Sequence, residues 1–500
     1  MMALRPSADR RSQAIVGLCA AAYWILVLAL LRGAPPHPLD DVWEDGVVAR
    51  HLIAGAGFRS TVLYPPLWAL RDPATLTVPV LVHGPLLPLA LILPLRLFGP
   101  GVLEHLSWAA AAIAACGAVQ THRLASRWLE GPILPAVAAS LFTLAPVMLT
   151  AVQHSPSVVL GGGLLMASLD LLVRERPRTM TAGLVLGLAS LIRPEMLLAA
   201  PILAALAAIE TRPSAPLRFA LGFVVPAAGW WVHQWRTSGL PMFNLSSYTF
   251  VGSFGDRPEH AVLRDFDLTP DRWPTTFRSA LPGLWRKWIE FLPRAAWHAL
   301  AATGATTGWL APWGAWLLLR RSALRPATVA CATLALLPVA TMTLALPVAL
   351  YLVPFLGLYA LAAARGVGSR VGEGAARRWP ARAWAPVLAL LVAASTGPDL
   401  ARAMVEARSR ARLLAAERRG LAASKATAAT RARPMFSDRP DFTAWTTGRP
   451  VLYVSRREYE ALYPASGPIE GERAHGLPPR RVPRDTWFHA GYWAVGDSVP

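Results

Sequence analysis

Apolar residues are gathered along this chain into long blocks, and charged residues fall mostly between them. Most blocks contain roughly 20 residues, the length of helix that crosses a hydrocarbon core of about 30 Å. The pattern therefore predicts helices buried in a bilayer, and the predicted segments cover residues 14–31, 78–98, 102–121, 132–151, 156–173, 180–192, 194–209, 217–235, 295–319, 326–346, 348–364 and 383–397.

Arginines in the short connections predict the topology, because cytoplasmic loops carry the excess of basic residues. These connections hold Arg123 and Arg127; Arg174, Arg176 and Arg178; Arg212 and Arg218; Arg320, Arg321 and Arg325; and the stretch 365–382. If all of them are inside, as is the N-terminus, the number of crossings is odd and loops 32–77 and 236–293 and the C-terminal tail face outward. Four prolines interrupt 78–98, so we take it as a re-entrant or interfacial helix and count about eleven spans. The alternative keeps 78–98 as a span and fuses 180–209 into one kinked span.

Composition agrees with a bilayer as the main solvent. Of 500 residues, 54% are hydrophobic and 16% charged, against roughly a quarter charged in soluble domains. The net charge of +19 comes from arginine, since lysine occurs only at Lys287 and Lys425. These cations already have a topological explanation, and no basic run is interleaved with aromatics, which argues against nucleic acid as a partner. Cys19, Cys116 and Cys331 lie inside apolar blocks without a histidine ligand set, and they predict small core residues.

The chain is expected to be an all-α polytopic membrane protein with a small α/β region at its C-terminal end. Residues 1–398 form the predicted membrane domain, 399–433 an Ala/Arg-rich helical connector, and 434–500 the extracytoplasmic region, which contains a strand-like stretch at 449–455. Basic residues precede 14–31 and no small-residue cleavage site is clear, so we interpret this segment as an uncleaved anchor.

The first outward loop carries a crowded set of carboxylates at Asp40, Asp41, Glu44 and Asp45. Such crowding raises at least one pKa, or it requires a cation or a basic partner, for which Arg50 and His51 are the nearest residues. A carboxylate at the membrane surface can accept the proton of an attacking hydroxyl. The alternative is a solvated acidic loop that caps the following helix.

The first loop also carries a family resemblance. The stretch LDDVWEDGVVARHLIAGAGF is similar to the first-loop signature of the GT-C glycosyltransferases, which include protein O-mannosyltransferases and the lipid A aminoarabinose transferase. In that family an acidic pair leads into a short helix of the form A-R-x-L-x-x-G-x-G. The matching residues here are Ala49, Arg50, Leu52, Gly55 and Gly57.

Three further stretches extend the resemblance along the chain. VLVHGPLLPLALILPLRLFGPG, which contains His83, resembles the family's H-P-P-L-x-P-L run. GLVLGLASLIRPEMLLAAP, with Arg193 and Glu195, resembles a G-L-x-x-G-L-A-x-L-T-R-P-E segment. FSDRPDFTAWTTGRPVLYV is similar to a region that follows the last span in many bacterial members.

The resemblance implies sugar transfer from a polyprenyl phosphate to an extracytoplasmic acceptor, at the outer face of the bacterial inner (plasma) membrane. It implies Asp40 as general base, with Asp41 beside it, and Arg50 and Arg193 as cations that neutralise the leaving phosphate. His83, Glu195, His154 and Tyr351 are the other candidate substrate-binding residues. No nucleotide-binding loop occurs, and no cofactor or metal ion is indicated, although a divalent metal stays possible.

The chain departs from the family pattern at two places. TAVQHSPSVVL lacks the second acid that many relatives place in this turn, which leaves His154 as its titratable residue. In ALPVALYLVPFLGLYAL, Leu350 occupies the arginine position before Tyr351. Two alternatives therefore stay open: a transporter or flippase for a lipid-linked solute, and an inactive GT-C-like scaffold.

Asp170 is an acid at the end of an apolar block. We expect it to reach the lipid headgroups or to pair with Arg174, one helical turn later.

Overall fold

The computed structural model describes most of the chain up to residue 371 and a few segments beyond it. The described residues are 10–31, 36, 41–72, 74–210, 213–252, 263, 268–304, 307–320, 325–371, 397–398, 401–402, 404–405, 412, 415, 435–437, 440–453 and 488–489. The chain divides into two compact units, each made of three stretches. Unit 1 comprises Met1–Pro35, Glu104–Gly229 and Trp288–Arg408, and unit 2 comprises Pro36–Leu103, Trp230–Lys287 and Ser409–Pro500. The residues around the domain bounds expected after 398 and 433 lie largely outside the described residues, so those bounds stay a prediction.

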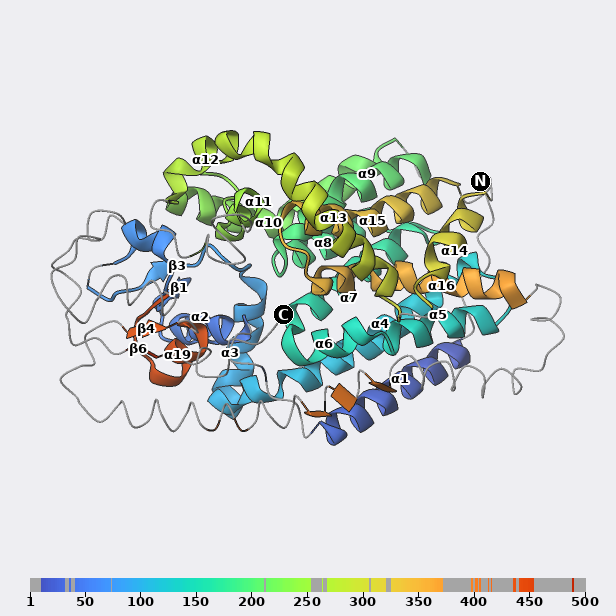
Figure 1. The fold of residues 1–500 in the computed structure, drawn as a ribbon, viewed down its shortest axis with the longest axis horizontal. Coiled ribbons are helices and arrows are strands. Elements are labelled where there is room, and N and C mark those ends of the chain that lie inside the picture. Colours follow the sequence, from blue (N-terminus) through green and yellow to red (C-terminus); the bar gives the residue numbers. More distant parts are fainter. Residues whose placement is uncertain are drawn as a thin grey trace. The chain divides into compact units, whose positions relative to one another are not determined.

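Unit 1 is built from helices, and Figure 1 shows them as a bundle of coiled ribbons. They are α1 (Arg10–Leu30), α4 (Leu106–Trp128), α5 (Ile133–Thr143), α6 (Pro146–His154), α7 (Pro156–Leu172), α8 (Thr179–Ser190), α9 (Ala199–Glu210), α10 (Ala215–Ser238, to Gly229), α13 (Leu284–Ala301, from Trp288), α14 (Leu310–Leu319), α15 (Arg325–Leu344) and α16 (Leu356–Val371). Short 3-10 helices join some of them: η2 (Pro100–His105, from Glu104), η3 (Pro194–Leu198) and η9 (Ala349–Phe355).

Several of these helices can cross a membrane. Within the described residues, five are long and apolar enough, and a sixth span results if α5 and α6, bent by 47° at their junction, count as one. The five are Arg10–Leu30, Pro100–Trp128, Ala215–Ser238, Pro326–Leu344 and Ala349–Ser369. The protein is therefore a multi-pass membrane protein. The total of about eleven spans and the orientation of the loops stay predictions.

Prolines explain why some apolar blocks are not single helices. Pro146 opens α6 directly after α5 ends, so the block 132–151 is bent. The predicted segments 180–192 and 194–209 are likewise separate, because α8 ends at Ser190 and Pro194 begins η3. In unit 2, block 78–98 contains only the 13-residue α3 (Leu86–Phe98) as helix. At 1.5 Å per residue it spans roughly 20 Å, too short to cross a bilayer by itself.

Glycines allow the helices of unit 1 to pack closely. A Cβ atom on Gly183 of α8 would lie 2.0 Å from the carbonyl oxygen of Phe219 in α10, and one on Gly222 would lie 2.1 Å from the carbonyl oxygen of Met180. A Cβ on Gly314 of α14 would lie 1.8 Å from a carbonyl oxygen of α16. Any larger residue at these positions would separate the backbones, as in other helix interfaces formed in lipid.

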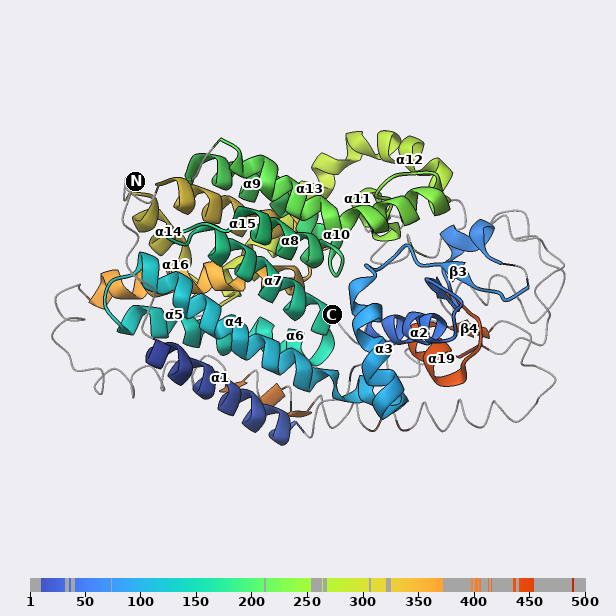
Figure 2. The same ribbon diagram turned by 180° about the vertical axis from the view of Figure 1, so that it is seen from behind.

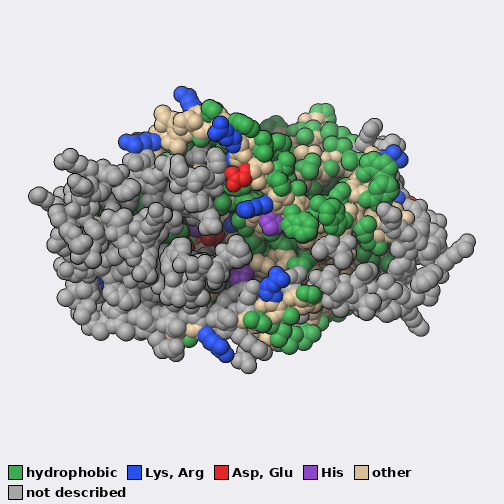
Figure 3. Space-filling model, viewed as in Figure 1, with side chains coloured by type: hydrophobic (Ala, Val, Ile, Leu, Met, Phe, Trp, Pro, Cys, Tyr) green, Lys and Arg blue, Asp and Glu red, His purple; other side chains and the backbone are tan. Residues whose placement is uncertain are grey.

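The outer face of unit 1 is apolar, which is expected of a surface that contacts lipid. On α10, Leu217, Leu221 and Val225 recur at every fourth position and are 53–65% exposed. On α1, Leu18 is 71% exposed. Figure 3 shows hydrophobic side chains over much of the described surface at α9, α14 and α15. Because large contiguous apolar surfaces are rare on soluble proteins, these faces indicate contact with the bilayer.

Unit 2 combines helices with short strands. Its elements are α2 (Val42–Ile53), β1 (Arg59–Ser60), β2 (Val62–Leu63), η1 (Pro65–Leu70), β3 (Val78–Pro79), α3, η4 (Leu245–Ser247), α11 (Tyr248–Val251), η6 (Pro270–Arg272), α12 (Trp273–Ala280), η7 (Leu281–Gly283), β4 (Met435–Ser437), α19 (Pro440–Thr447), β5 (Val451–Tyr453) and β6 (Phe488–His489). A four-stranded parallel sheet has the order β2-β5-β4-β6, and β1 pairs antiparallel with β3.

The sheet joins the first loop to the C-terminal end of the chain. Val62 pairs with Val451, and the backbone N–H of Val451 donates to the carbonyl oxygen of Thr61 at 2.8 Å. The expected strand at 449–455 thus exists as β5, and its partner β2 comes from the first outward loop. Figure 2 shows α19 beside α2, the helix of that loop.

Candidate active site

The carboxylates of the first loop lie at the beginning of α2. Asp40 is outside the described residues. Asp41 is the N-cap residue, and its side chain makes no capping hydrogen bond. Glu44 and Asp45 in the first turn are only 1% and 4% exposed. The positive end of the helix dipole stabilises acids at this position, but a buried carboxylate also requires direct partners. This burial disagrees with the alternative of a solvated acidic loop.

Glu44 has two direct partners on one oxygen. The hydroxyl of Tyr64 donates to Glu44 Oε2 at 2.8 Å, and Nε2 of His83 lies 3.0 Å from the same atom. Burial alone lowers the pKa of His83, but the carboxylates of Asp41, Glu44 and Asp45 outweigh it and raise the pKa to about 10. His83 is therefore a cation at neutral pH, and it balances part of the acidic charge.

Backbone contacts hold His83 and Tyr64 in place. Asn244 Nδ2 donates to the carbonyl oxygen of Val82 at 2.8 Å, and the N–H of Leu245 donates to the carbonyl oxygen of Leu81 at 2.7 Å. Tyr64 follows strand β2, and its ring meets Tyr453 of β5 edge to face at 6.0 Å. The pairing of β2 with β5 thus fixes the phenol against Glu44.

The basic partner of Glu44 is His83, which the sequence did not name for this role. Asp40 lies outside the described residues, so the expectation for Arg50 and His51 stays a prediction. Both residues lie in the last turn of α2, and Glu44 and Asp45 lie in the first. Arg50 Nη1 donates to the carbonyl oxygen of Trp445 at 2.7 Å, and its guanidinium lies 3.2 Å from the centroid of that ring. Burial lowers the pKa of Arg50 to about 10, so it stays charged at neutral pH. The same cause, followed by the charges of Arg59 and Arg50, lowers the pKa of His51.

Asp441 is a site residue that sequence reasoning missed. It lies in the first turn of α19. Burial, followed by the charges of Glu44 and Asp41, raises the pKa of Asp441 well above its usual range, and His83 opposes this only in part. Its Oδ1 is buried and has no hydrogen-bond partner among the described residues. Burial and the neighbouring carboxylates thus favour the protonated form of Asp441, which makes it a potential proton donor beside the cluster.

Lys287 is a second residue that the sequence did not assign. Its side chain is fully buried in α13 and donates to three backbone carbonyl oxygens, those of Thr249, Phe250 (3.3 Å) and Gly252 (2.6 Å). Burial lowers the pKa of Lys287 to about 7. These carbonyls lie at and after the C-terminal end of α11, so Lys287 fixes this end of the loop between α10 and α12.

The remaining predicted site residues belong to unit 1. Arg193 Nε donates to Glu195 Oε1 at 2.7 Å, and the guanidinium lies 6.0 Å from the ring centroid of Tyr351 in η9. The side chains of Arg193 and Glu195 are 15% and 18% exposed, so they are reachable from outside the protein. Leu350 directly precedes Tyr351 in η9. His154 is the last residue of α6 and is half-buried.

The structure thus gathers the predicted site residues into two groups. Asp41, Arg50 and His83 belong to unit 2, and Arg193, Glu195, His154 and Tyr351 belong to unit 1. Within the described part of the chain, no three His, Cys, Asp or Glu side chains are arranged to hold a metal ion. The metal requirement and the role of each residue stay predictions.

The solved structures similar to this chain include two of one bacterial protein and one of an archaeal protein. ArnT from Cupriavidus metallidurans in the apo state has 16% identity and a TM-score of 0.50, over 88% of this chain and 85% of that one. The same protein bound to undecaprenyl phosphate has 15% identity and a TM-score of 0.50, over 88% and 86%. The apo oligosaccharyltransferase of Archaeoglobus fulgidus has 12% identity and a TM-score of 0.50, over 91% of this chain and 66% of that one.

These similarities establish the fold. At 12–16% identity they extend over most of the chain, and they confirm the predicted GT-C-like fold. No protein-family model and no curated protein matches the sequence.

Proposed function

We propose that this GT-C-like membrane protein is a glycosyltransferase that moves a sugar from a polyprenyl-phosphate donor to an extracytoplasmic acceptor. The observation that carries the proposal is the buried acidic cluster of α2, with cationic His83 and with Asp441, whose pKa is raised, beside it. The fold supports it, since ArnT shares that fold and has been crystallised bound to undecaprenyl phosphate. We place the protein in the bacterial inner membrane, with the first loop and tail outside.

The acidic cluster supplies the proton acceptor that transfer requires. As the acceptor's oxygen or nitrogen bonds to the anomeric carbon, its proton must move to a base. We assign this role to Asp40, with Asp41 beside it at the N-cap of α2. The ion pair of Glu44 with His83 and the hydrogen bond from Tyr64 hold the first turn of this helix in place.

In unit 1, the guanidinium of Arg193 is the group that we assign to the phosphate of the donor. When the bond between the anomeric carbon and the phosphate oxygen breaks, negative charge develops on the lipid phosphate, and a prepositioned guanidinium stabilises it. The hydrogen bond from Arg193 Nε to Glu195 orients that guanidinium, and Tyr351 lies under it at 6.0 Å. Because Leu350 has no charge where relatives place an arginine, we assign the phosphate contact to Arg193.

Conservative removal of each acid tests the assignment. Purified D40N and D41N are compared with D271N, a matched change at an exposed carboxylate of η6 in the same unit. The measurement is release of polyprenyl phosphate from a labelled polyprenyl-phosphate sugar in the presence of envelope extract as the source of acceptors. We expect D40N to lose about 100-fold or more, as removal of a general base does, D41N to lose less, and D271N to match the unchanged protein. Full activity in D40N would refute its role as base.

Leu350 specifically favours one other function, that of an inactive scaffold with the same fold. A photoreactive polyprenyl-phosphate probe separates the two. A transferase is labelled in unit 1 and turns over its donor, whereas a scaffold is neither labelled nor active. Movement of lipid across vesicles without sugar transfer would instead identify the flippase that the sequence left open.

A further inference from the structure

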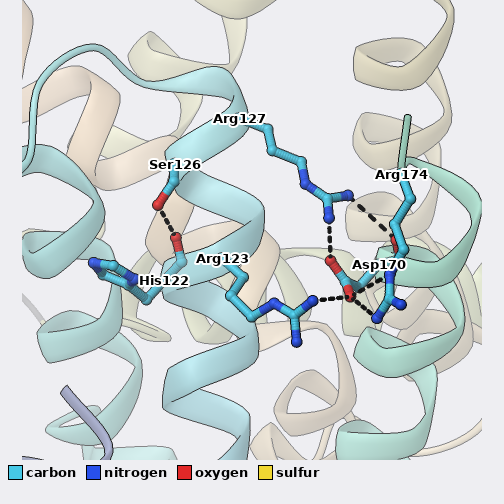
Figure 4. A network of polar contacts seen from close by, with 6 residues as sticks. All are labelled: His122, Arg123, Ser126, Arg127, Asp170 and Arg174. Carbon is cyan, nitrogen blue, oxygen red and sulfur yellow. Dashed lines mark hydrogen bonds and ion pairs between the residues drawn. The ribbon is translucent and has the colours of Figure 1, made fainter. Parts of the chain in front are cut away.

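Three arginines converge on a single aspartate at the ends of α4 and α7, in unit 1 (Figure 4). Asp170 Oδ1 lies 3.0 Å from Arg127 Nη2, and Oδ2 lies 2.7 Å from Arg174 Nη2 and 3.5 Å from Arg123 Nη2. Arg127 Nη1 also donates to the backbone carbonyl oxygen of Asp170 at 3.3 Å. Three positive charges therefore surround one negative charge, and none of these residues belongs to the groups assigned to sugar transfer.

The surroundings do not fully balance the excess of positive charge. The C-terminal ends of α4 and α7 contribute partial negative charges of roughly half a unit each. Glu175 is exposed in the connection after α7, but this connection also carries the exposed Arg176 and Arg178. The last two turns of α4, the last turn of α7 and the residues that directly follow each helix, up to Glu130 and Arg178, together hold five arginines and three carboxylates, a net charge of +2. A charge of this sign at the edge of an apolar helix bundle favours a bound anion.

Hydrogen-bond donors are available for such an anion. A guanidinium has five N–H groups, and Asp170 engages only some of those on Arg123 and Arg174. Arg123 Nε is buried and has no hydrogen-bond partner among the described residues. The side chains of Arg123 and Arg174 are each 29% exposed, whereas those of Arg127 and Asp170 are 6% and 3% exposed. Asp170 and Arg127 thus form a buried ion pair, and this pair holds the two partly exposed guanidiniums of Arg123 and Arg174 at the surface.

We propose that Arg123 and Arg174, held by Asp170, form a binding site for the phosphate group of an anionic membrane lipid. Guanidinium groups bind phosphate oxygens through paired, charge-assisted hydrogen bonds. The site lies where two apolar helices end, Leu106–Trp128 and Pro156–Leu172, which is the level of the lipid headgroups. A lipid phosphate reaches this position from the bilayer and ties the ends of α4 and α7 to the membrane edge. This inference does not depend on the proposed sugar transfer.

Lipid binding to the purified full-length protein tests the site. Native mass spectrometry in neutral detergent counts bound phosphatidylglycerol as it is titrated, with diacylglycerol as the lipid that lacks a phosphate. R123Q/R174Q removes the two outer guanidiniums, and the matched control R176Q/R178Q removes the same charge from exposed positions of the connection. We expect the affinity of R123Q/R174Q to fall about tenfold or more and that of the control to change by less than about twofold. An equal loss in both variants would overturn the site, since general surface attraction would then explain binding.

Two further measurements complete the test. If R123Q/R174Q fails to fold, R123K/R174K replaces it, because lysines keep the charge beside Asp170 but lack the paired donors. We expect it to bind at least about threefold more weakly than the unchanged protein, and an unchanged affinity would contradict the role of the guanidiniums. Inorganic phosphate at millimolar concentration is the competitor that tests the source of the anion. We expect little displacement of lipid, and complete displacement would overturn the lipid as the occupant.

Discussion

The two buried ionic clusters of this protein have opposite compositions. In unit 2, the carboxylates of Asp41, Glu44 and Asp45 surround one cation, His83. In unit 1, three guanidiniums surround one carboxylate, Asp170. Each minority residue makes the burial of the majority possible, because like charges without a counter-ion are costly in a low-dielectric surrounding. The sign of the excess then determines the chemistry: the first cluster can accept protons, and the second can bind anions.

The largest loss of stability is expected from removal of Asp170, the one carboxylate among the three guanidiniums. D170A leaves Arg127 buried without its carboxylate, and we expect a loss of stability of about 3–5 kcal/mol, the cost of breaking a buried ion pair. Thermal unfolding in detergent measures it as a large drop in Tm. The matched control is D72A, because the carboxylate of Asp72 accepts hydrogen bonds from Ala74 and Thr75 of its own turn. A similar Tm in D170A and the unchanged protein would show that the arginines do not need a counter-ion.

The minority residue of unit 2 provides a second test, with its own dependence on pH. H83Q removes the ion pair with Glu44 and leaves the hydrogen bond from Tyr64. We expect the free energy of unfolding to fall by about 2–3 kcal/mol near neutral pH. The folded-state pKa of His83 is raised to about 10. Its contribution is therefore fully present below the ordinary histidine pKa of about 6.5 and disappears as pH rises through about 10.

Unfolding midpoints between pH 6 and pH 10 measure this dependence. The advantage of the unchanged protein over H83Q should shrink steadily across that range. H105Q, at the exposed His105 of η2, is the control and should show a constant difference. An advantage of H83 that grows with pH would mean that His83 is neutral in the folded protein.

The smallest expected effect concerns the contact that joins α2 to α19. R50Q removes the stacking of the guanidinium on Trp445 and the hydrogen bond to its carbonyl oxygen. We expect the free energy of unfolding to fall by about 1–2 kcal/mol. R50K retains the charge and should lose less than R50Q. If both variants stay folded but lose most of their rate of sugar transfer, Arg50 also contacts the donor, as the family resemblance implies.

Local features of the fold could be predicted from the sequence, because each depends on neighbouring residues. The apolar blocks predicted helices at α1, α4, α7, α10 and α15. The spacing of four residues gave the ion pair of Asp170 with Arg174 as one of two alternatives, and this pair lies at 2.7 Å. Crowding alone indicated that the acids of the first loop need a basic partner. The helical breaks were less accessible, since Pro146 bends one block while Pro226 lies within the continuous helix α10.

The partners of these residues were not predictable, because they arrive from distant parts of the chain. Arg127 reaches Asp170 across 43 residues, and Arg50 reaches Trp445 across 395. His83 reaches Glu44 because the residues after β3 are fixed by Asn244 and Leu245, which lie more than 150 residues further along the chain. Asp441 gave no local signal beyond its place in the RPDFTAW stretch, and its raised pKa exists only when α19 lies against α2.

The parallel pairing of β2 with β5 has a consequence for synthesis of the protein. Residue 62 leaves the ribosome long before residue 451, yet the two lie side by side in the finished sheet. Strand β2 of the nascent first loop must therefore wait without its neighbouring strand until almost the whole polypeptide has been translated. A chain terminated before residue 435 would lack three of the four strands and the helix that carries Asp441. Such a truncation should therefore prevent the first loop, several hundred residues upstream, from reaching its folded structure.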